Sequence, residues 1–583
     1  MDGNIWVVTA KVFHPVEEKH TSWGERSMLL KVIPALDWLQ NYKQENLKGD
    51  LAAGLIIAIM LVPQGMAYAM IAGLPPVVGL YASTFPLITY VLFGSSRQLA
   101  VGPVAMMSLL VFAGVSAFAE PGSEKYVSLV LLVSLMVGAM QLCMGLLRVG
   151  FIVNFMSHAV ISGFTSAAAI IILLSQLHHL FGIKVLSGGH SAIHLLKEII
   201  RGLEGIDPTT FGIGSGSILV LLIFKKKLPN FPAPIVVVIL SVLAVYLFDL
   251  DQSGLRIVGH VPKGLPFFSW PGGSLNSLLD LFPAALTIFF VGFMESISVA
   301  KMIAAKEKYK IEPNRELIGL GFANIVGSFL SAYPVTGGFS RTAVNYQAGA
   351  KTGLASIVTA AIILLTLIFF TSVFYHLPHA VLAAIVIVAV VGLIDVKGAK
   401  HLFRLKRIDG WTLMITFIAT LAIGSKEGIL IGVAFSLLVF IWRSAHPHAA
   451  ELGYLEKENV FRNLKRFPDG RTYPEALILR VDASLYFANM AFLEDFLRKR
   501  IVEKPNVRWI IIDLSGVNDL DAVAIDTLSE MMDNYHDQGI QFIWANMKGP
   551  VRDLVARAGW EEKYGKQVEY LSIHQALKGI GLL

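Results

Sequence analysis

The strongest constraint on this chain is a series of long apolar segments that are separated only by short polar loops. A helix needs about 20 apolar residues to cross a bilayer, and fewer where other helices surround it. Thirteen segments meet this criterion. They are 51–73, 76–93, 103–119, 126–147, 155–182, 210–224, 232–249, 276–304, 314–332, 354–376, 379–395, 410–424 and 426–444. The sequence therefore predicts a polytopic α-helical membrane protein.

Composition agrees with this class and excludes several others. Of the 583 residues, 55% are hydrophobic and 15% are charged, whereas soluble domains carry about a quarter charged residues. The net charge of +6 comes from basic residues in short loops, which does not predict nucleic-acid binding. Cys143 is the single cysteine, and no GxxxxGK[ST] or HExxH motif is present. We expect no enzyme, no cofactor, no metal site and no cleavable signal peptide.

One stretch, residues 331–353, lies between apolar segments but is too polar to be classified by hydropathy. It carries Gly337, Gly338, Ser340 and Arg341 where a lipid-facing helix carries leucine and valine. Loop charges decide whether it crosses. With a cytoplasmic amino terminus, the basic residues between 397 and 407 fall on the cytoplasmic side only if this stretch crosses. The sequence thus predicts fourteen segments and a cytoplasmic carboxyl-terminal region.

Two of these segments are interrupted. Gly102 and Pro103 break the third segment, and Pro103 suits the first turn of a new helix. Residues 333–339 break the tenth segment in the same way, and a half-helix is predicted to begin near Ser340. The fourteen segments divide into two halves of seven, and each break falls in the third segment of its half. Because seven is odd, the second half begins on the opposite side of the membrane and is inverted relative to the first. Broken segments at matching places in inverted halves indicate a transporter binding site.

The chemistry at these breaks favours an anion. Two half-helix amino termini present free N–H groups and positive dipole ends, and Arg341 adds a full charge. The alternative is that Arg341 is a structural residue, paired with a carboxylate or with helix-end carbonyls.

Several motifs closely resemble those of the SulP anion permeases. They are LVPQGMAYAMIAGLPPVVGLY (61–81), GSSRQLAVGPVAMMSLL (94–110), NFMSHAVISGFTSAAA (154–169), ESISVAK and PVTGGFSRT. The resemblance implies a transporter domain of the uracil-permease-like fold, with core and gate domains, joined to a cytoplasmic STAS domain. Members carry sulfate, bicarbonate, dicarboxylates or halides, so the resemblance implies an anion without choosing it.

The resemblance also implies which residues bind the anion. They are Gln64, Tyr68, Pro103, Val104, Ala105, Phe339, Ser340 and Arg341. Ala105 has no hydroxyl group, so a contact there must come from its backbone. Gln64 is equally well explained as a helix–helix contact, although Tyr68 lies one turn further on the same face. His158 belongs to a family-like motif, but its spacing predicts no chemical role.

Glu295 is an acidic side chain deep within the eighth segment. An intramembrane carboxylate is by default a candidate proton or cation relay. Protonation removes a negative charge beside the anion site, which is a direct route to proton–anion symport. In the family that the motifs resemble, a glutamate here accompanies proton coupling and an aspartate accompanies sodium-dependent bicarbonate uptake. The alternative is a permanent ion pair between Glu295 and Arg341. Asp280, near the start of the segment, is expected at the interface.

Residues 474–583 alternate apolar strands with helical patterns at 490–503 and 521–537, which predicts a small α/β domain with a mixed sheet. Its DLSGVNDLDAVAIDTL stretch resembles the STAS signature. Phosphorylatable STAS domains carry Ser or Thr after the aspartate of that turn, whereas Ala522 follows Asp521 here. We therefore expect dimer contact or partner binding instead of a phosphoswitch.

The predicted domains are a cytoplasmic N-terminal segment (1–48), a transporter domain (49–445), a linker with a first edge strand (446–473) and the STAS domain (474–583). The expected function is proton-coupled sulfate symport by elevator-like displacement, in a homodimer in the cell (inner) membrane, in contact with membrane lipid and with no nucleic-acid partner. The alternatives are bicarbonate transport (sodium- or proton-coupled), C4-dicarboxylate transport, a passive anion channel, and a membrane-anchored STAS signalling scaffold.

Overall fold

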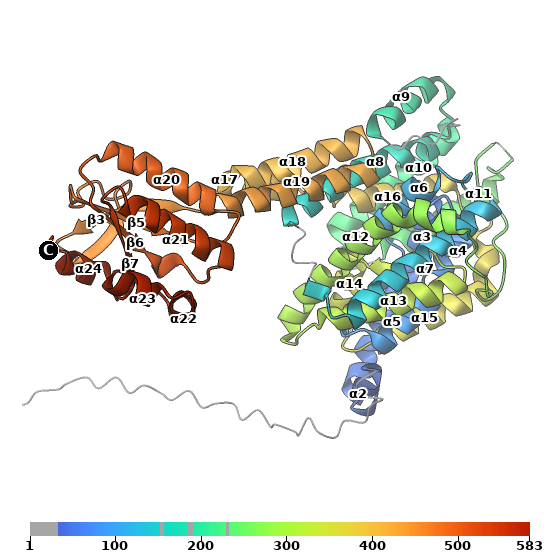
Figure 1. Ribbon diagram of the computed structural model, residues 1–583. Helices are drawn as coiled ribbons and strands as arrows, with labels where there is room; N and C mark the ends of the chain where they lie inside the picture. Colours follow the sequence, from blue (N-terminus) through green and yellow to red (C-terminus); the bar gives the residue numbers. More distant parts are fainter. Residues whose placement is uncertain (1–32, 152–156, 184–190, 229–231, 253) are drawn as a thin grey trace, which may run out of the picture. The chain divides into compact units, whose positions relative to one another are not determined.

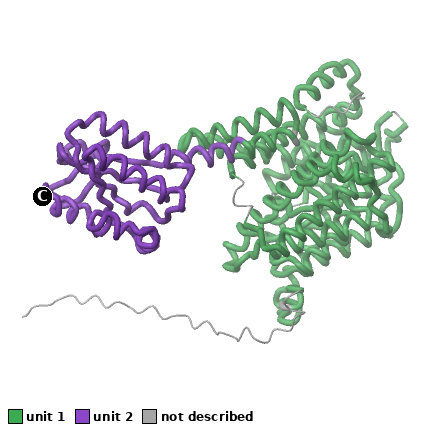
Figure 2. Tube along the Cα trace, viewed as in Figure 1, with its two compact units in different colours: residues 1–434 green, residues 435–583 purple. Residues whose placement is uncertain are grey.

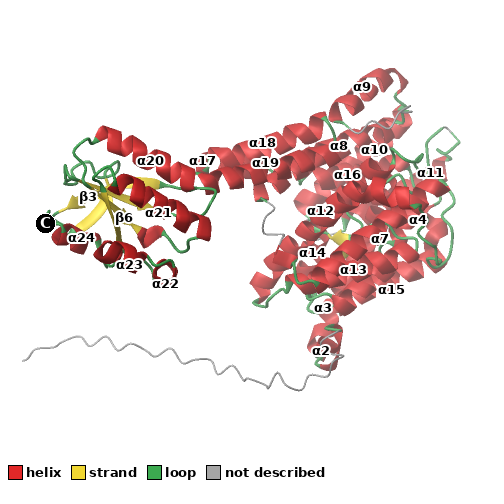
Figure 3. Ribbon diagram, in the orientation of Figure 1, coloured by secondary structure: helices red, strands yellow, loops and turns green. Residues whose placement is uncertain are grey.

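The computed structural model describes residues 33–151, 157–183, 191–228, 232–252 and 254–583 (Figure 1). The expected N-terminal segment is therefore described only from residue 33 onward. Two compact units divide the chain, one up to Ala434 and one from Phe435 to Leu583 (Figure 2). The first unit is helical apart from one short pair of strands, and the second contains a sheet (Figure 3).

The helices of the first unit follow the apolar segments. They are α2 (Ala35–Gln40), α3 (Gln44–Ile71), α4 (Pro76–Tyr81), α5 (Phe85–Phe93), α6 (Ala105–Val115), α7 (Glu124–Leu146), α8 (His158–Phe181), α9 (Ala192–Gly202), α10 (Pro208–Lys227), α11 (Ala233–Phe248), α12 (Leu275–Glu307), α13 (Pro313–Phe329), α14 (Phe339–Gln347), α15 (Leu354–Leu365), α16 (His379–Val391), α17 (Val396–Leu405), α18 (Arg407–Ala422) and α19 (Ser425–Ala445). Within the described residues, nine helices or joined helices are long and apolar enough to cross a membrane.

Each of the thirteen predicted segments contains helix, with two irregularities. The segment 76–93 is divided into α4 and α5 by a turn before Phe85. The segment 354–376 begins as α15 and continues as a π-helical turn, Thr366–Phe370, and a 3-10 turn, Thr371–Phe374. The polar stretch contains a short helix, α14, of 9 residues.

In the first unit, the short α2 and two helices between predicted segments were not expected from the sequence. The basic residues Lys397, Lys400 and Arg404 were assigned to a loop but lie on α17, which the Asp395 side chain caps by accepting from the Gly398 N–H at 2.7 Å. Likewise α9 begins where the Ser191 hydroxyl accepts from His194 N–H at 3.3 Å. Both are too short to cross a bilayer, so span-length reasoning does not detect them.

The helices of this unit form two groups. The first group contains α3–α7 and α12–α15, and the second contains α8–α11 with α16–α19; most packing lies within a group. Small residues allow the helices within each group to pack closely. A Cβ placed at Gly79 of α4 would lie 1.9 Å from the Gly65 carbonyl oxygen of α3, and one placed at Gly163 of α8 would lie 2.3 Å from the Leu413 carbonyl oxygen of α18.

A two-residue antiparallel ladder lies among the helices (Figure 3). It joins β1 (Val101–Gly102), just before α6, to β2 (Thr336–Gly337), just before α14, with Val101 opposite Gly337. Both strands are fully buried. The ladder satisfies backbone groups that the interrupted segments leave without helical partners.

Buried polar side chains hold the chain on either side of this ladder. Glu316 of α13 accepts from the Ser95 and Ser96 N–H groups at 2.8 and 3.0 Å and from the Tyr90 hydroxyl at 2.7 Å. Asn324, two turns later, accepts from the Val335 N–H at 2.7 Å. One helix thus anchors the approach to both strands.

The second unit has a five-stranded mixed sheet, as predicted. Its strands are β3 (Ala449–Leu455), β4 (Val460–Asn463), β5 (Ala476–Val481), β6 (Trp509–Asp513) and β7 (Gln541–Ala545), in the order β4-β3-β5-β6-β7. The β5–β6 and β6–β7 pairs are parallel and the others antiparallel. Two strands, one of them interior, lie within residues 446–473, where a linker and one edge strand were expected.

Helices cover both faces of this sheet. They are α20 (Met490–Glu503), α21 (Ala522–His536), α22 (Gly549–Arg557), α23 (Trp560–Tyr564) and α24 (Ile573–Gly579). Leu477 and Leu479 face the core that α20–α23 complete, while Ile478 between them faces α24. The predicted helices at 490–503 and 521–537 are confirmed. Asp521 is the N-cap of α21, where it accepts from the Ala524 N–H at 2.7 Å.

Candidate functional site

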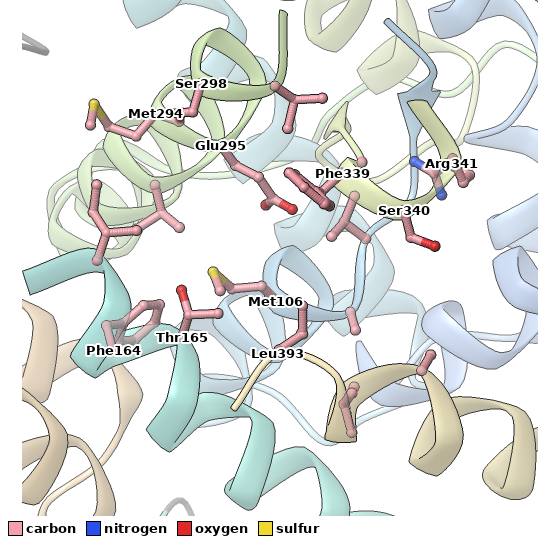
Figure 4. A pocket seen from close by; sticks show the side chains of 18 of the residues that line it. Met106, Phe164, Thr165, Met294, Glu295, Ser298, Phe339, Ser340, Arg341 and Leu393 are labelled. Atoms are coloured by element: carbon pink, nitrogen blue, oxygen red, sulfur yellow. The ribbon is translucent and has the colours of Figure 1, made fainter. Parts of the chain in front are cut away.

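A cavity of about 330 Å³ lies inside the helical unit (Figure 4). One wall comes from the first helix group, through α3, the start of α6, α12 and the start of α14. The other wall comes from the second group, through α8, residues around the end of α16, and α19. The cavity therefore lies between the two groups of helices.

Most of the residues predicted to bind an anion line this cavity. They are Gln64, Tyr68, Val104, Ala105, Phe339, Ser340 and Arg341. Glu295, the predicted coupling residue, lines it too. Pro103 is not among the lining residues, although its carbonyl oxygen accepts a hydrogen bond from Arg341. The fold thus brings together residues that are more than two hundred positions apart in the sequence.

Both short helices begin at the cavity. The helix α6 starts at Ala105, with Val104 as N-cap, and not at Pro103 as the sequence suggested. The helix α14 starts at Phe339, with Gly338 as N-cap, one residue before the predicted position. Neither N-cap side chain makes a capping hydrogen bond. The first-turn N–H groups and the positive dipole ends of both helices therefore face the site.

Arg341 ties the two interrupted segments together. Its side chain is 3% exposed, and its guanidinium donates to the Pro103 carbonyl oxygen and, at 3.5 Å, to that of Ala100. The Nε atom is buried without a partner among the described residues. The structure thus pairs Arg341 with backbone carbonyls of the non-helical residues before α6, where a carboxylate or helix-end carbonyls were the structural alternatives, and still places its charge at the cavity wall.

Two glycines lie beside this guanidinium. A Cβ at Gly338 would lie 3.0 Å from Arg341 Nη2, which is closer than side chains normally approach. Gly102 has φ +152°, and a Cβ there would lie 3.4 Å from the same atom. Glycine at both positions lets the chain pass beside the buried arginine.

Glu295 points into the cavity from α12 (Figure 4). Its Oε2 atom is buried and has no hydrogen-bond partner within the described part of the chain. An ion pair requires a nitrogen–oxygen distance of 4.0 Å or less, and among the described residues none is recorded between Glu295 and Arg341. In the view of Figure 4 the Phe339 ring lies between them. A permanent Glu295–Arg341 ion pair is therefore absent from this structure.

The residue next to Glu295 supports β2. The Ser296 hydroxyl accepts from the Gly337 N–H at 2.8 Å and lies 2.6 Å from the Thr336 hydroxyl oxygen. Thr336 in turn donates to the Gly292 carbonyl of α12 at 2.6 Å. This buried network fixes the start of α14 against the helix that carries Glu295.

Sequence reasoning missed three polar residues of the cavity: His158, Thr165 and Ser298. His158, Ile161 and Thr165 are spaced i, i+3, i+7 along α8, so they share one face. That spacing was visible in the sequence, but nothing there indicated that α8 faces the interrupted segments. Only the packing of the two groups reveals it.

Comparisons with known proteins match both units of the chain. The model of the sulfate permease family matches residues 47–416, and the STAS domain model matches residues 468–576. Sulfate transporter 4.1, chloroplastic, from Arabidopsis thaliana is 38% identical over 97% of this chain and 86% of its own length.

Solved structures share the fold. The murine Solute Carrier 26 family member A9 anion transporter in the inward-facing state superposes with TM-score 0.87 and 25% identity over 96% of each chain. The transmembrane domain of the cyanobacterium bicarbonate transporter BicA superposes with TM-score 0.58 and 23% identity over 68% of this chain and 98% of its own.

A matched pair of variants tests the network behind the cavity. Ser296→Ala leaves the buried Gly337 N–H without an acceptor, so we expect it to lower the free energy of unfolding by about 1–3 kcal/mol. Ser298→Ala, two residues further along the same helix, removes only a hydrogen bond to the Met294 carbonyl of that helix. It should change the free energy of unfolding by less than about 0.5 kcal/mol. Unfolding midpoints in detergent measure both, and equal midpoints would contradict the assignment.

Proposed function

Because the chain belongs to the sulfate permease family and carries a STAS domain, we propose that it is a secondary active anion transporter, with sulfate as the preferred substrate. The relatives named sulfate transporters support the choice of substrate. The observation that carries the proposal is the cavity where two helix amino termini, a buried arginine and a buried carboxylate meet.

The substrate binds at the amino termini of α6 and α14. A sulfate dianion accepts hydrogen bonds from the uncapped first-turn N–H groups, with Ser340 donating from its hydroxyl and Gln64 and Tyr68 completing the wall. Arg341 acts mainly through its charge, because Pro103 and Ala100 already accept from its guanidinium. Oxyanions match this donor-rich site better than neutral solutes or cations do.

Glu295 couples the transport to protons. Among the described residues, its buried Oε2 atom has no hydrogen-bond donor to stabilise the negative charge of the carboxylate. When an anion enters the same cavity, the repulsion between the two charges favours a proton on Glu295. Anion and proton therefore bind together, which gives symport.

Uptake into proteoliposomes tests the coupling. An inward proton gradient is expected to accelerate uptake of labelled sulfate, and in Glu295→Gln the ratio of uptake with and without the gradient should fall to about one, because an amide cannot titrate. Asp280→Asn, exposed near the start of the same helix, is the matched control and should retain the acceleration.

Further arms separate the rivals. Arg341→Gln should lose uptake with and without the gradient.

Uptake that follows the sodium gradient and ignores pH would refute the assignment of the proton as coupling ion. A preference for labelled bicarbonate or succinate would refute sulfate as the preferred substrate. Flux that no ion gradient can drive uphill would indicate a passive channel. A transport-inactive Arg341 variant with full biological activity would favour a signalling scaffold.

We propose an elevator-like movement in which the first helix group carries the site past the second. The motivating observation is that the groups pack mainly within themselves and that the cavity lies between them. Shear between such groups exposes a site to alternate sides without dismantling it.

Cross-linking tests this movement. In a Cys143→Ser background, cysteines replace Met106 and Thr165, which line the cavity from α6 and α8. A cleavable cross-linker between them should stop uptake, and cleavage should restore it. A cross-link within the first group, between cysteines at Ser128 and Gly272, which lie 3.1 Å apart (Oγ to N), should leave uptake intact. Equal uptake in both cross-linked variants would refute the elevator.

The proposed architecture has fourteen segments in two inverted halves, with α6 and α14 as the third and tenth, spanning residues 49–445. Residues 1–48 and the STAS domain, whose sheet includes β3 and β4 within residues 446–473, lie on the cytoplasmic side of the cell membrane, and the protein is a homodimer. Protease protection of tags at both ends in sealed vesicles tests the orientation, since tags on opposite sides would contradict an even number of crossings.

A further inference from the structure

A second cavity, of about 490 Å³, lies in the sheet-containing unit, and the proposed transport function does not use it. It is lined by His448, Arg462, Asn463, Arg466, Phe467, Arg480 and Asp482. These residues come from the start of β3, from β4 and the turn that follows it, and from the end of β5. We propose that this cavity binds a tetrahedral oxyanion of the phosphate class.

The backbone places these side chains together. The strands β4, β3 and β5 are neighbours in the sheet, and the Asp482 N–H donates to the His448 carbonyl at 2.9 Å. The turn after β4 is shaped by Asn463, whose side-chain oxygen accepts from the Lys465 N–H at 2.9 Å and whose carbonyl accepts from Arg466 N–H at 3.0 Å. This turn places Arg462 and Arg466 on the same cavity.

The charges of the lining are unbalanced. Asp482 is the acidic residue among them, and it accepts from Arg480 Nε at 2.6 Å and lies 2.8 Å from His448 Nδ1. Burial raises the pKa of Asp482, but the hydrogen bonds from Arg480 and His448 outweigh this and hold it below its usual value. Asp482 is thus ionised and already engaged, and it does not neutralise the other two arginines.

Arg462 and Arg466 supply the excess charge. Both are exposed, and within the described residues neither side chain has a recorded hydrogen bond or ion pair. The arginines elsewhere on this unit include paired ones: Arg471 contacts Glu456 at 3.1 Å and Arg500 contacts Glu503 at 2.7 Å. Two unpaired planar guanidinium groups on one cavity match a phosphate or sulfate group, whose oxygens accept paired N–H bonds.

Two sources supply this chemistry: a soluble phosphate or sulfate compound, or the phosphate of a lipid headgroup. The lipid source is tested in a separate experiment, because α19 is apolar enough to cross a membrane and ends at Ala445, three positions before His448. The test therefore distinguishes them while asking first whether the cavity binds an oxyanion at all.

The full chain is placed in phosphatidylcholine nanodiscs and titrated with inorganic phosphate by calorimetry. Arg462→Gln combined with Arg466→Gln should weaken binding at least about tenfold, as expected for the loss of two charge-assisted contacts. Arg471→Gln combined with Arg508→Gln removes two charges from the same unit outside the cavity and should change the affinity less than about twofold. All variants keep the central cavity unchanged, so phosphate bound there cancels in the comparison.

Asp482→Asn is expected to change the phosphate affinity in the opposite direction. It removes the carboxylate from the lining, so phosphate should bind several-fold more tightly. Equal affinities in the two double variants, or no tightening in Asp482→Asn, would overturn the proposal and leave these arginines as a solvated surface.

Nanodiscs that contain phosphatidylglycerol identify the source. If lipid headgroups occupy the cavity, the wild-type affinity for phosphate falls in these discs through competition, while the Arg462/Arg466 double variant does not respond. An unchanged wild-type affinity assigns the cavity to soluble oxyanions.

Discussion

The pairing of two interrupted segments through β1 and β2 is the interaction on which the rest of the helical unit depends. Backbone N–H and C=O groups within the hydrocarbon layer have no water to bond, so an interrupted span must find partners in the protein. The ladder between Val101–Gly102 and Thr336–Gly337 supplies some of them. Ser296 and Asn324 supply others, through Gly337 and Val335. An opening for a polar solute can therefore exist with few unsatisfied backbone groups around it besides the N–H groups at the starts of α6 and α14.

Arg341 illustrates how a single side chain serves both structure and site. Its guanidinium bonds the carbonyls of the opposite segment, which explains why a charge is tolerated in a buried position. The same charge lies at the wall of the cavity, where the amino termini of α6 and α14 add positive potential. Glu295, whose Oε2 atom has no hydrogen-bond partner in the described part of the chain, is the opposing charge. In the proposed mechanism, the bound anion and a proton on Glu295 together balance this site.

The two proposed anion sites differ in the groups that would attract an anion. The central one relies on helix termini and one buried arginine, which suits a dry site where the anion loses its hydration. The cavity of the second unit relies on two exposed arginines, Arg462 and Arg466, while the partly buried Arg480 is engaged by Asp482. A site of the second kind is more sensitive to ionic strength, because solvent-exposed charges are screened.

Several features could be predicted from local sequence alone. Apolar segments of membrane length, the breaks at Pro103 and at residues 333–339, and the strand–helix alternation after residue 474 each depend on the chemistry of neighbouring residues. The same local reasoning did not detect short helices whose start is fixed by a polar capping side chain. It read the basic residues of α17 as a loop, because the Asp395 cap decides that helix. It also missed the second strand before Tyr473, since β4 gains its partner only in the sheet.

The sequence by itself determined the class of protein, the positions of the interruptions and two charged residues of the central cavity, Glu295 and Arg341, because hydrophobicity, proline and buried charge act locally. Only the tertiary structure decided what those residues contact. It paired Arg341 with carbonyls instead of Glu295, and it turned the α8 face with His158 and Thr165 toward the cavity. It also gathered Arg462, Arg466 and Arg480 around one hollow. These outcomes depend on which helices and strands pack together, and such long-range packing leaves no periodic signal within a single segment.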